Sequence, residues 1–245
     1  MLPAFIAEAA EIIEGPAPLL FTCEHASPRV PSPLEPSADD SAILETHWGW
    51  DIGASALTRA LVGRLGASAV LSRFSRLVCD ANRALDDPTW IMGQVEGHRI
   101  AFNRRVDPAE RLRRLQTYHA PYHSAVDAAL GVMGPQTVLI AIHSFTPVYI
   151  QEVREMKVGV LYDDCEDAAF AVRDAIASEI PETTLNAPYS GLDGAMYSAT
   201  RHGRGHDLTY LELELRQDLL ATPDGIQLTA DRLASALRQA GLARP

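Results

Sequence analysis

The stretch Thr137-Val138-Leu139-Ile140-Ala141-Ile142 is a continuous β-branched and aliphatic run that starts shortly after Gly134-Pro135. A run of this length without a charged residue is typical of a strand that is covered on both faces. His143 and Ser144 follow it directly. We therefore predict the central strand of a layered sheet, with a histidine at the point where that strand ends.

Further apolar runs predict the other strands of the sheet. They occupy residues 19–23, 69–71, 77–79, 157–162 and 208–215. Between them, helical periodicity and capping residues predict helices. These are a helix over 37–66 in two pieces broken near Gly49, a long helix from Asp107-Pro108, and helices over 167–178 and 227–240. Residues 24–36 and the Gly-rich segment 186–207 are predicted to be loops.

Two of these helices show which side chains face the core. Leu57, Leu61 and Leu65 recur every four residues in the second half of the two-part helix. In the long helix, the predicted apolar face consists of Leu112, Leu115, Tyr122, Val126 and Ala129. Spacings of three and four residues place such side chains on one side of a helix.

Strands that alternate with helices indicate an α/β protein built as a three-layer αβα sandwich. No internal repeat, low-complexity tract or Ser/Gly linker divides the sequence, so we expect a single domain over residues 1–245. Sheets of this kind bind ligands at the carboxyl ends of their strands. Residues that carry chemistry are therefore expected where the predicted strands end.

The composition, with 47% hydrophobic and 22% charged residues, is that of an ordinary globular protein. A formal net charge of −11 argues against a nucleic-acid partner, because phosphates require a basic face. The three cysteines are widely spaced and form no Cys-x-x-Cys pair, which fits a reducing compartment. The first residues lack the features of a signal peptide, and no apolar run matches a bilayer, so we expect a cytoplasmic protein without a membrane partner.

Three side chains suggest a metal site. His25 follows the strand predicted at residues 19–23 and His143 follows the central strand, so both imidazoles are expected in one crevice. Asp51 lies where the second half of the two-part helix begins. Taken singly, a strand-end histidine often bonds a loop, and Asp51 suits the dipole of its helix. Together, two histidines and one carboxylate form a three-ligand zinc site with an open fourth position.

The strand predicted at residues 208–215 has acidic residues on one face. Because side chains alternate along a strand, Glu212, Glu214 and Arg216 share a face. One interpretation is a solvated sheet edge. The other is a general base directed into the crevice.

Arg73, Arg76 and Arg83 form a cationic cluster, together with Asn82, in an otherwise acidic chain. Arginine and asparagine suit the binding of a carboxylate, and surface ion pairing is the alternative. Motifs for nucleotide binding and the Gly-x-Ser-x-Gly elbow of serine hydrolases do not occur, which argues against both classes.

The remaining histidines give weaker signals. His119 and His123 stand four residues apart on the long helix, where they either share a ligand or pack as polar residues. His202 and His206 lie in the Gly-rich segment with two tyrosines, Tyr189 and Tyr197. That segment fits a mobile lid over a substrate as well as it fits ligation.

Seven motifs, in order over about residues 19–220, make the sequence similar to the N-formylglutamate amidohydrolase family. They are Cys23-Glu24-His25-Ala26-Ser27, Trp50-Asp51-Ile52-Gly53-Ala54, Ser75-Arg76-Leu77-Val78-Cys79-Asp80-Ala81-Asn82-Arg83, Tyr118-His119-Ala120-Pro121-Tyr122-His123, Ile142-His143-Ser144-Phe145, Pro188-Tyr189-Ser190-Gly191 and Leu213-Glu214-Leu215-Arg216-Gln217-Asp218-Leu219.

The resemblance implies a zinc exopeptidase-like fold, also described as phosphorylase/hydrolase-like, with a central mixed, mostly parallel sheet between helices. It implies that His25 and His143 bind Zn²⁺ and that Glu214, rather than Glu212, is the catalytic glutamate. It further implies that Asn82 and Arg83 bind the α-carboxylate of the substrate.

The sequence departs from zinc carboxypeptidases at one ligand. Those enzymes carry the ligating carboxylate three residues after the first histidine, where this sequence has Pro28. Related zinc amidases take that ligand from a helix farther along, which corresponds to Asp51. Glu24 is the alternative ligand, but its adjacency to His25 turns it to the opposite face of a continuing strand.

The resemblance therefore implies a zinc-dependent amidohydrolase of amino-acid (histidine) catabolism, which converts N-formyl-L-glutamate to formate and glutamate. Arg76 is expected to stabilise the oxyanion, and Arg73, Tyr189 and His202 are expected to contact this small anionic substrate. A cation for the substrate side chain is open among Arg73, Arg201 and Arg204. Other N-acyl amino acids or short peptides are alternative substrates, and a non-catalytic binding module is an alternative of another class. The oligomeric state is not predicted.

Overall fold

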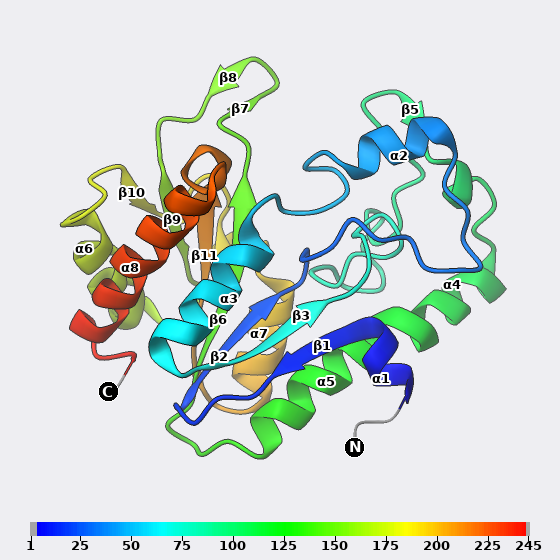
Figure 1. The fold of residues 1–245 in the computed structure, drawn as a ribbon. Coiled ribbons are helices and arrows are strands. Elements are labelled where there is room, and N and C mark those ends of the chain that lie inside the picture. Colours follow the sequence, from blue (N-terminus) through cyan, green and yellow to red (C-terminus); the bar gives the residue numbers. More distant parts are fainter. Residues whose placement is uncertain (1–3, 244–245) are drawn as a thin grey trace.

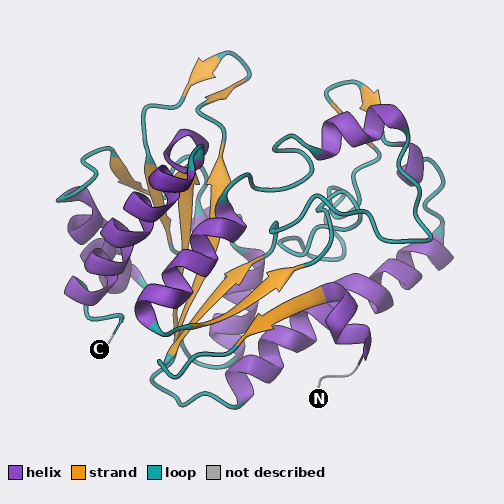
Figure 2. Ribbon diagram, viewed as in Figure 1, coloured by secondary structure: helices purple, strands orange, loops and turns teal. Residues whose placement is uncertain are grey.

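A computed structural model describes residues 4–243, in which a seven-stranded sheet lies between two layers of helices (Figures 1 and 2). Across the sheet, the strands are β1 (Ala10–Ile13), β3 (Ser68–Ser72), β2 (Leu19–Cys23), β6 (Val138–Phe145), β11 (Thr209–Arg216), β9 (Val158–Leu161) and β10 (Thr183–Leu185). The four neighbours β3, β2, β6 and β11 are parallel. β1 is antiparallel to β3, β9 is antiparallel to β11, and β10 is parallel to β9. This mixed, mostly parallel sheet confirms the predicted α/β class.

The helices are divided between the two faces of the sheet (Figure 1). One face is covered by α3 (Ala54–Leu65), α6 (Glu166–Ala177) and α8 (Pro223–Gln239). The other is covered by α5 (Ala120–Gly131) and α7 (Tyr197–Gly205), with α1 (Ala4–Ala9) beside α5. α4 (Pro108–Arg114) leads into α5, and α2 (Ala38–Leu44) lies apart from the layers, near the ribbon of β4 (Gln94–Val95) and β5 (His98–Arg99).

The central strands are buried on both faces, as the apolar runs predicted. Phe21 of β2 and Ile140 of β6 pack in the layer of α3, α6 and α8. Their neighbours Leu20 and Leu139 pack in the layer of α5 and α7. Each fully buried side chain of this size contributes about 1.5–3 kcal/mol to folding, so these strands anchor both cores.

The two-part helix is confirmed, with α2 and α3 separated by residues 45–53. Ser37 caps α2 in a capping box with Asp40. At Gly49 a Cβ would lie 2.1 Å from the carbonyl oxygen of Leu44, which explains a glycine in this break. The predicted leucine stripe of α3 is buried against the sheet.

The strand predicted at residues 77–79 is wrong, because this segment forms a turn. The carbonyl of Leu77 accepts a hydrogen bond from Asn103 Nδ2 at 2.8 Å, and that of Val78 accepts one from Arg114 Nη1 at 2.7 Å. Side-chain donors thus take the place of a partner strand, and the apolar residues are buried without joining the sheet.

The loop predicted at residues 186–207 is wrong over its second half, which forms α7. This helix lacks a side-chain cap at Met196, and it has glycines in its second half, a pattern that is more typical of a loop. Gly203 instead permits close packing, because a Cβ there would lie 2.2 Å from ring atoms of Tyr210 on β11. The glycine reflects helix–strand contact rather than flexibility.

The long helix begins at Asp107 as predicted, but a π-helical segment, Leu115–His119, separates α4 from α5. An extra residue in a helical turn rotates the preceding face relative to the following one. Leu112, predicted to be in the core, is therefore 51% exposed, whereas Arg114 and Tyr118 are buried.

No sequence pattern predicted α1, β1, β10 or the two short ribbons. The second ribbon pairs β7 (Val148–Tyr149) with β8 (Glu152–Val153) and stands out from the molecule at the top of Figure 1. Its tip residues Ile150 and Gln151 have φ values of 47° and 66°. None of the described helices is long and apolar enough to cross a membrane.

Candidate active site

Polar side chains converge where the parallel strands β2, β3, β6 and β11 end, around a cavity of about 360 Å³. This volume lies within the range of small-molecule sites. The wall consists of His25, His47, Trp48, Asp51, Arg76, Asp80, Asn82, Arg83, Thr89, Met92, His143, Ser144, Tyr149, Tyr189, Ala195, Glu212 and Glu214.

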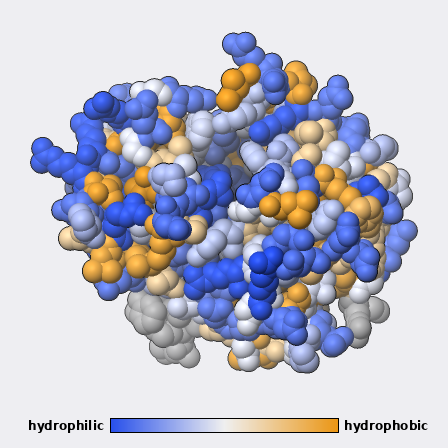
Figure 3. Space-filling model, turned by 180° about the vertical axis from the view of Figure 1, so that it is seen from behind, coloured by the Kyte–Doolittle hydropathy of each residue, from blue (hydrophilic) through white to orange (hydrophobic). Residues whose placement is uncertain are grey.

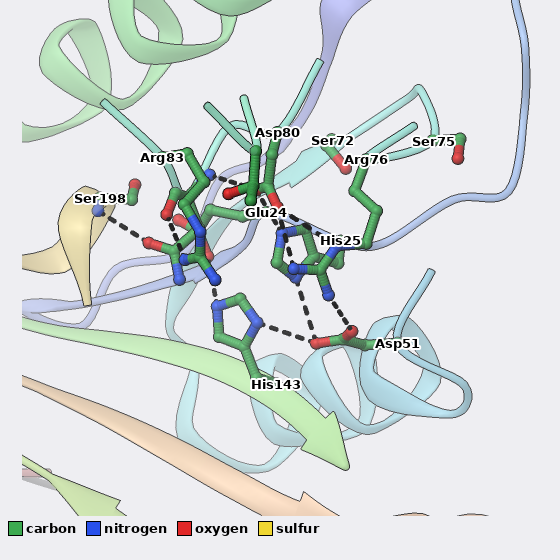
Figure 4. A network of polar contacts seen from close by, with 12 residues as sticks. Glu24, His25, Asp51, Ser72, Ser75, Arg76, Asp80, Arg83, His143 and Ser198 are labelled. Carbon is green, nitrogen blue, oxygen red and sulfur yellow. Dashed lines mark hydrogen bonds and ion pairs between the residues drawn. The ribbon is translucent and has the colours of Figure 1, made fainter. Parts of the chain in front are cut away.

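His25, Asp51 and His143 form a buried group in this wall. Nδ1 of His143 lies 2.8 Å from Oδ2 of Asp51, and Nδ1 of His25 lies 3.4 Å from the same oxygen. One potential ligand atom of each residue lies within 4.8 Å of the other two. Figure 4 shows both imidazoles turned toward Asp51. The group is consistent with the metal site expected from the sequence.

The backbone ties Asp51 to both histidine-bearing segments. Asp51 N donates to the carbonyl of His25 at 2.9 Å, and Ser144 N donates to Oδ2 of Asp51 at 3.2 Å. Gly53 follows with φ 85°, and a Cβ there would lie 2.5 Å from Leu220. The turn before α3 therefore requires glycine at this position, and it fixes where the carboxylate points.

A second carboxylate contacts the other nitrogen of each histidine. Nε2 of His25 lies 2.7 Å from Oδ1 of Asp80, and Nε2 of His143 lies 3.0 Å from Oε2 of Glu24 (Figure 4). A hydrogen bond at Nε2 fixes the ring and leaves Nδ1 available to a cation. Both rings thus present Nδ1 to the same place, beside Asp51.

Glu24 lies outside the group of possible ligand atoms, because it contacts the nitrogen of His143 that faces away from Asp51. The hydroxyl of Tyr122 donates to Oε1 of Glu24 at 3.0 Å. Burial alone would raise the pKa of Glu24, but the hydrogen bond from His143 and the positive charge of that ring lower it to about 2. The geometry favours Asp51 over Glu24 as the carboxylate ligand.

Negative charge exceeds positive charge around these histidines. Five carboxylates are at most 5% exposed, and two arginines line the cavity; they are Glu24, Asp51, Asp80, Glu212 and Glu214, with Arg76 and Arg83. Burial would lower the pKa of His143, but Glu212, Asp51 and Glu24 raise it well above its ordinary value. The site therefore stabilises a cation between the histidines, and a divalent metal fits both the charge and the donor set.

β11 brings Glu212 and Glu214 to the cavity. The interpretation of this strand as a solvated sheet edge is wrong, because β11 lies between β6 and β9. The side chains of Glu212 and Glu214 are 2% and 5% exposed. Glu212 is engaged, with Oε2 accepting from Asn82 Nδ2 at 3.4 Å. Glu214 lies opposite His143 in the strand register, and its buried Oε2 has no hydrogen-bond partner among residues 4–243. Burial raises the pKa of Glu214 well above its ordinary value.

Arg76 is held by acidic residues of the same site. Its Nε and Nη2 donate to Oδ2 of Asp80 at 3.2 and 2.9 Å, and its Nη1 donates to Oδ1 of Asp51 at 3.5 Å. Burial would lower the pKa of Arg76, but Asp80 and Asp51 raise it. The guanidinium is thus a fixed positive charge next to the candidate metal ligands.

Arg83 is less engaged than Arg76. Its Nη1 donates to the carbonyl of Asn82 at 2.8 Å, its Nε lies 3.9 Å from Asp87, and its side chain is 30% exposed. The side-chain amide of Asn82 is bonded within the protein, to Ala195 O at 3.1 Å and Ser198 N at 2.9 Å. Asn82 therefore ties the cavity wall to the start of α7.

The other predicted substrate contacts are not all brought together. Tyr189 lines the cavity, but Arg73 and His202 do not. Arg73 follows the end of β3 and turns to α1, where its Nη1 donates to Ala7 O at 2.6 Å. His202 lies on α7, with Nδ1 2.7 Å from Oδ1 of Asp127.

Three further histidines, His119, His123 and His202, are buried together, and His119 lies beside the Arg83 segment. Nδ1 of His123 lies 2.8 Å from Nε2 of His202, and Nε2 of His119 lies 3.2 Å from the carbonyl of Arg83. Burial lowers the pKa of His119 to about 4 and that of His123 well below its ordinary value. At neutral pH these two histidines are therefore uncharged, and His119 supports the backbone at Arg83. His206 contacts Asp127 at 3.2 Å.

Sequence reasoning missed the residues that hold the histidines. Asp80 and Tyr122 were part of two quoted motifs, but nothing in the sequence paired them with His25 and Glu24. Tyr149 and Trp48 in the cavity wall were also missed. The quoted motifs were the one sequence signal for Asp80 and Tyr122. Which residue each of them contacts follows from the fold.

A family model described as N-formylglutamate amidohydrolase matches residues 17–221. The crystal structure of a gene product from Agrobacterium tumefaciens is 32% identical, with 96% of this chain and 95% of that chain covered and a TM-score of 0.88. The fold is also similar to that of N-formylglutamate amidohydrolase from Ralstonia eutropha JMP134, at 20% identity, 97% and 98% coverage and a TM-score of 0.72. No curated protein matches the chain.

Proposed function

The chain belongs to the N-formylglutamate amidohydrolase family, and on this premise we propose that it hydrolyses N-formyl-L-glutamate to formate and glutamate. Family membership indicates an amidohydrolase, and the particular substrate is the proposed part. The observation that carries the proposal is the buried group of His25, Asp51 and His143 in the same cavity wall as Glu214, whose Oε2 has no partner in the described chain.

We infer that His25, Asp51 and His143 hold a zinc ion. A zinc ion held there would supply Lewis acidity toward the amide carbonyl and would lower the pKa of a water to about 7. Asp80 and Glu24 keep the two imidazoles oriented through their Nε2 hydrogen bonds. The second carboxylates are thus part of the same functional unit as the ligands.

Glu214 is the proposed general base and general acid. It accepts a proton from the attacking water and then donates it to the nitrogen that leaves with the amino acid. Its burial and its raised pKa suit a group that must hold a proton between these two steps. Arg76, fixed by Asp80 and Asp51, is the proposed cation for the carbonyl oxygen that becomes negative.

Arg83, with Asn82, is proposed to hold the α-carboxylate of the substrate. The guanidinium of Arg83 has donors without a hydrogen-bond partner among residues 4–243, and it lines the cavity. Asn82 contributes by fixing the Arg83 segment, since its own amide is already bonded. Positioning of this kind places the scissile amide beside the reacting groups. Tyr189 forms part of the wall around the substrate.

The proposal is tested with a panel of N-formyl and N-acetyl amino acids, assayed with metal-stripped protein before and after zinc is added. Formate release from N-formyl-L-glutamate that requires zinc is the expected result. Activity confined to other members of the panel would identify a different N-acyl amino acid as the substrate. Zinc binding without hydrolysis of any panel member would instead indicate a binding module.

A further inference from the structure

Arg154, which follows β8, lies among three aromatic rings at the edge of the cavity. Its Cζ is 4.8 Å from the ring centroid of Tyr149, 5.3 Å from that of Tyr189 and 5.5 Å from that of Phe145. Tyr149 and Tyr189 line the cavity. Rings that stack on a guanidinium hold its plane in place while its N–H groups remain available at the edge.

The guanidinium of Arg154 has no carboxylate partner among residues 4–243. Its Nη1 donates to Thr146 O and its Nη2 to the hydroxyl of Tyr189, both at the long distance of 3.4 Å. Arg76, by contrast, contacts two carboxylates. A half-buried arginine without a carboxylate partner among the described residues is available to bind an anionic ligand.

The charge of Arg154 acts on groups in the cavity wall. Burial raises the pKa of Tyr189, Glu214 adds to this, and Arg154 opposes it. Burial also lowers the pKa of His47, another residue of the wall, and Arg154 contributes in the same direction. Tyr189 thus experiences the fields of both Glu214 and Arg154.

The sequence offered three other arginines as the cation for the substrate side chain, and all three are engaged elsewhere. Arg73 donates to Ala7 O. Arg201 and Arg204 border a separate cavity, where Arg204 Nε donates to Asp164 at 2.7 Å and Arg201 Nη1 donates to the hydroxyl of Tyr197 at 3.2 Å.

We propose that Arg154 binds the side-chain carboxylate of the substrate and thereby selects acidic N-acyl amino acids. Arg83 and Arg154 then supply one cation for each carboxylate of a glutamate skeleton. The two arginines come from different segments, one after β3 and one after β8. The inference rests on the proposed function for the reaction, but the binding of a dicarboxylate tests it without turnover.

The first test compares kcat/KM for N-formyl-L-glutamate and N-formyl-L-glutamine, which differ in the side-chain carboxylate alone. In Arg154→Gln we expect the preference for glutamate to fall by about ten- to a hundredfold, the scale of a lost hydrogen bond to a charged group. Arg154→Lys keeps the charge and should restore part of it. The matched control Arg83→Gln should lower kcat/KM for both substrates by the same factor. An unchanged preference in Arg154→Gln overturns the proposal.

The second test measures binding of glutarate and glutaramate to the protein as purified, by calorimetry. Glutarate has the carbon skeleton and both carboxylates of glutamate, and glutaramate has an amide in place of one carboxylate. The preference for glutarate should fall by about tenfold or more in Arg154→Gln. If this occurs although no N-formyl amino acid is hydrolysed, the proposed function fails and the inference stands. An equal preference in both proteins overturns the inference, whatever the hydrolysis assay shows.

Discussion

His25 and His143 each have a carboxylate at Nε2, Asp80 for the first and Glu24 for the second. A ring held in this way loses little freedom when a metal binds at its other nitrogen. The same carboxylates leave an excess of negative charge beside Asp51. Binding of a divalent metal should therefore stabilise the folded protein as well as complete the site.

The roles of the two candidate carboxylates are separated by Asp51→Ala and Glu24→Ala. Asp51→Ala removes a ligand and should leave little zinc after dialysis. Glu24→Ala removes the group behind His143 and should retain the site with zinc affinity about ten- to a hundredfold lower. Elemental analysis and chelator competition measure both quantities. Zinc retained by the Asp51 variant and lost by the Glu24 variant would show that Glu24 is the ligand.

The candidate ligands could be predicted because each lies where an element ends or begins. Their supporting residues could not, since Asp80 is 55 positions from His25 and Tyr122 is 98 positions from Glu24. Contacts over such separations depend on how the layers pack. Arg154 was missed because it follows a short ribbon that no sequence pattern predicted, and because Tyr189 is 35 positions away.

Among the elements, α7 is the one whose glycines were misinterpreted. Gly203 packs against the ring of Tyr210, whereas nothing lies within 4 Å of a Cβ at Gly205, at the end of the same helix. The two positions therefore distinguish packing from helix propensity within one element.

Gly203→Ala should lower the free energy of unfolding by about 1–3 kcal/mol, because the added methyl group overpacks the contact with Tyr210. The matched control Gly205→Ala should change it by no more than about 0.5 kcal/mol or raise it slightly. Urea unfolding of both variants measures the difference. Equal effects at the two positions would contradict the packing argument.

Periodicity predicted the elements that depend on a regular apolar pattern, such as β6, α3 and α8. It failed where side chains replace regular partners. Residues 77–79 are buried because Asn103 and Arg114 bond their carbonyls. The face of the long helix shifted because a π-helical segment interrupts it. Neither event leaves a periodic signal.

At the scale of the molecule, the face seen in Figure 3 is mostly hydrophilic, with apolar colour in separate patches. The net charge of −11 extends into the cavity, where carboxylates outnumber arginines. The proposed anionic substrate would therefore require a metal to offset these carboxylates, and Arg83 and Arg154 to meet its own charges.

Acid stability provides a test that does not involve the metal. Burial lowers the pKa of His119 from 6.5 to about 4, so between these values the unfolded chain binds a proton that the folded protein does not. The stabilisation is fully present above pH 6.5 and is lost as the pH falls toward 4. His119→Gln can still donate to the carbonyl of Arg83 and does not titrate. Its Tm should fall less between pH 7 and pH 5 than that of the wild type, and an equal fall would contradict this assignment.

The central claim is that Glu214 acts as a proton-transfer group beside a metal held by His25, Asp51 and His143. It is tested most directly by measuring zinc content and formate release from N-formyl-L-glutamate in wild type and Glu214→Gln. We predict equal zinc content and a loss of turnover of about a hundredfold or more in the variant. Near-normal turnover in zinc-loaded Glu214→Gln would contradict the claim.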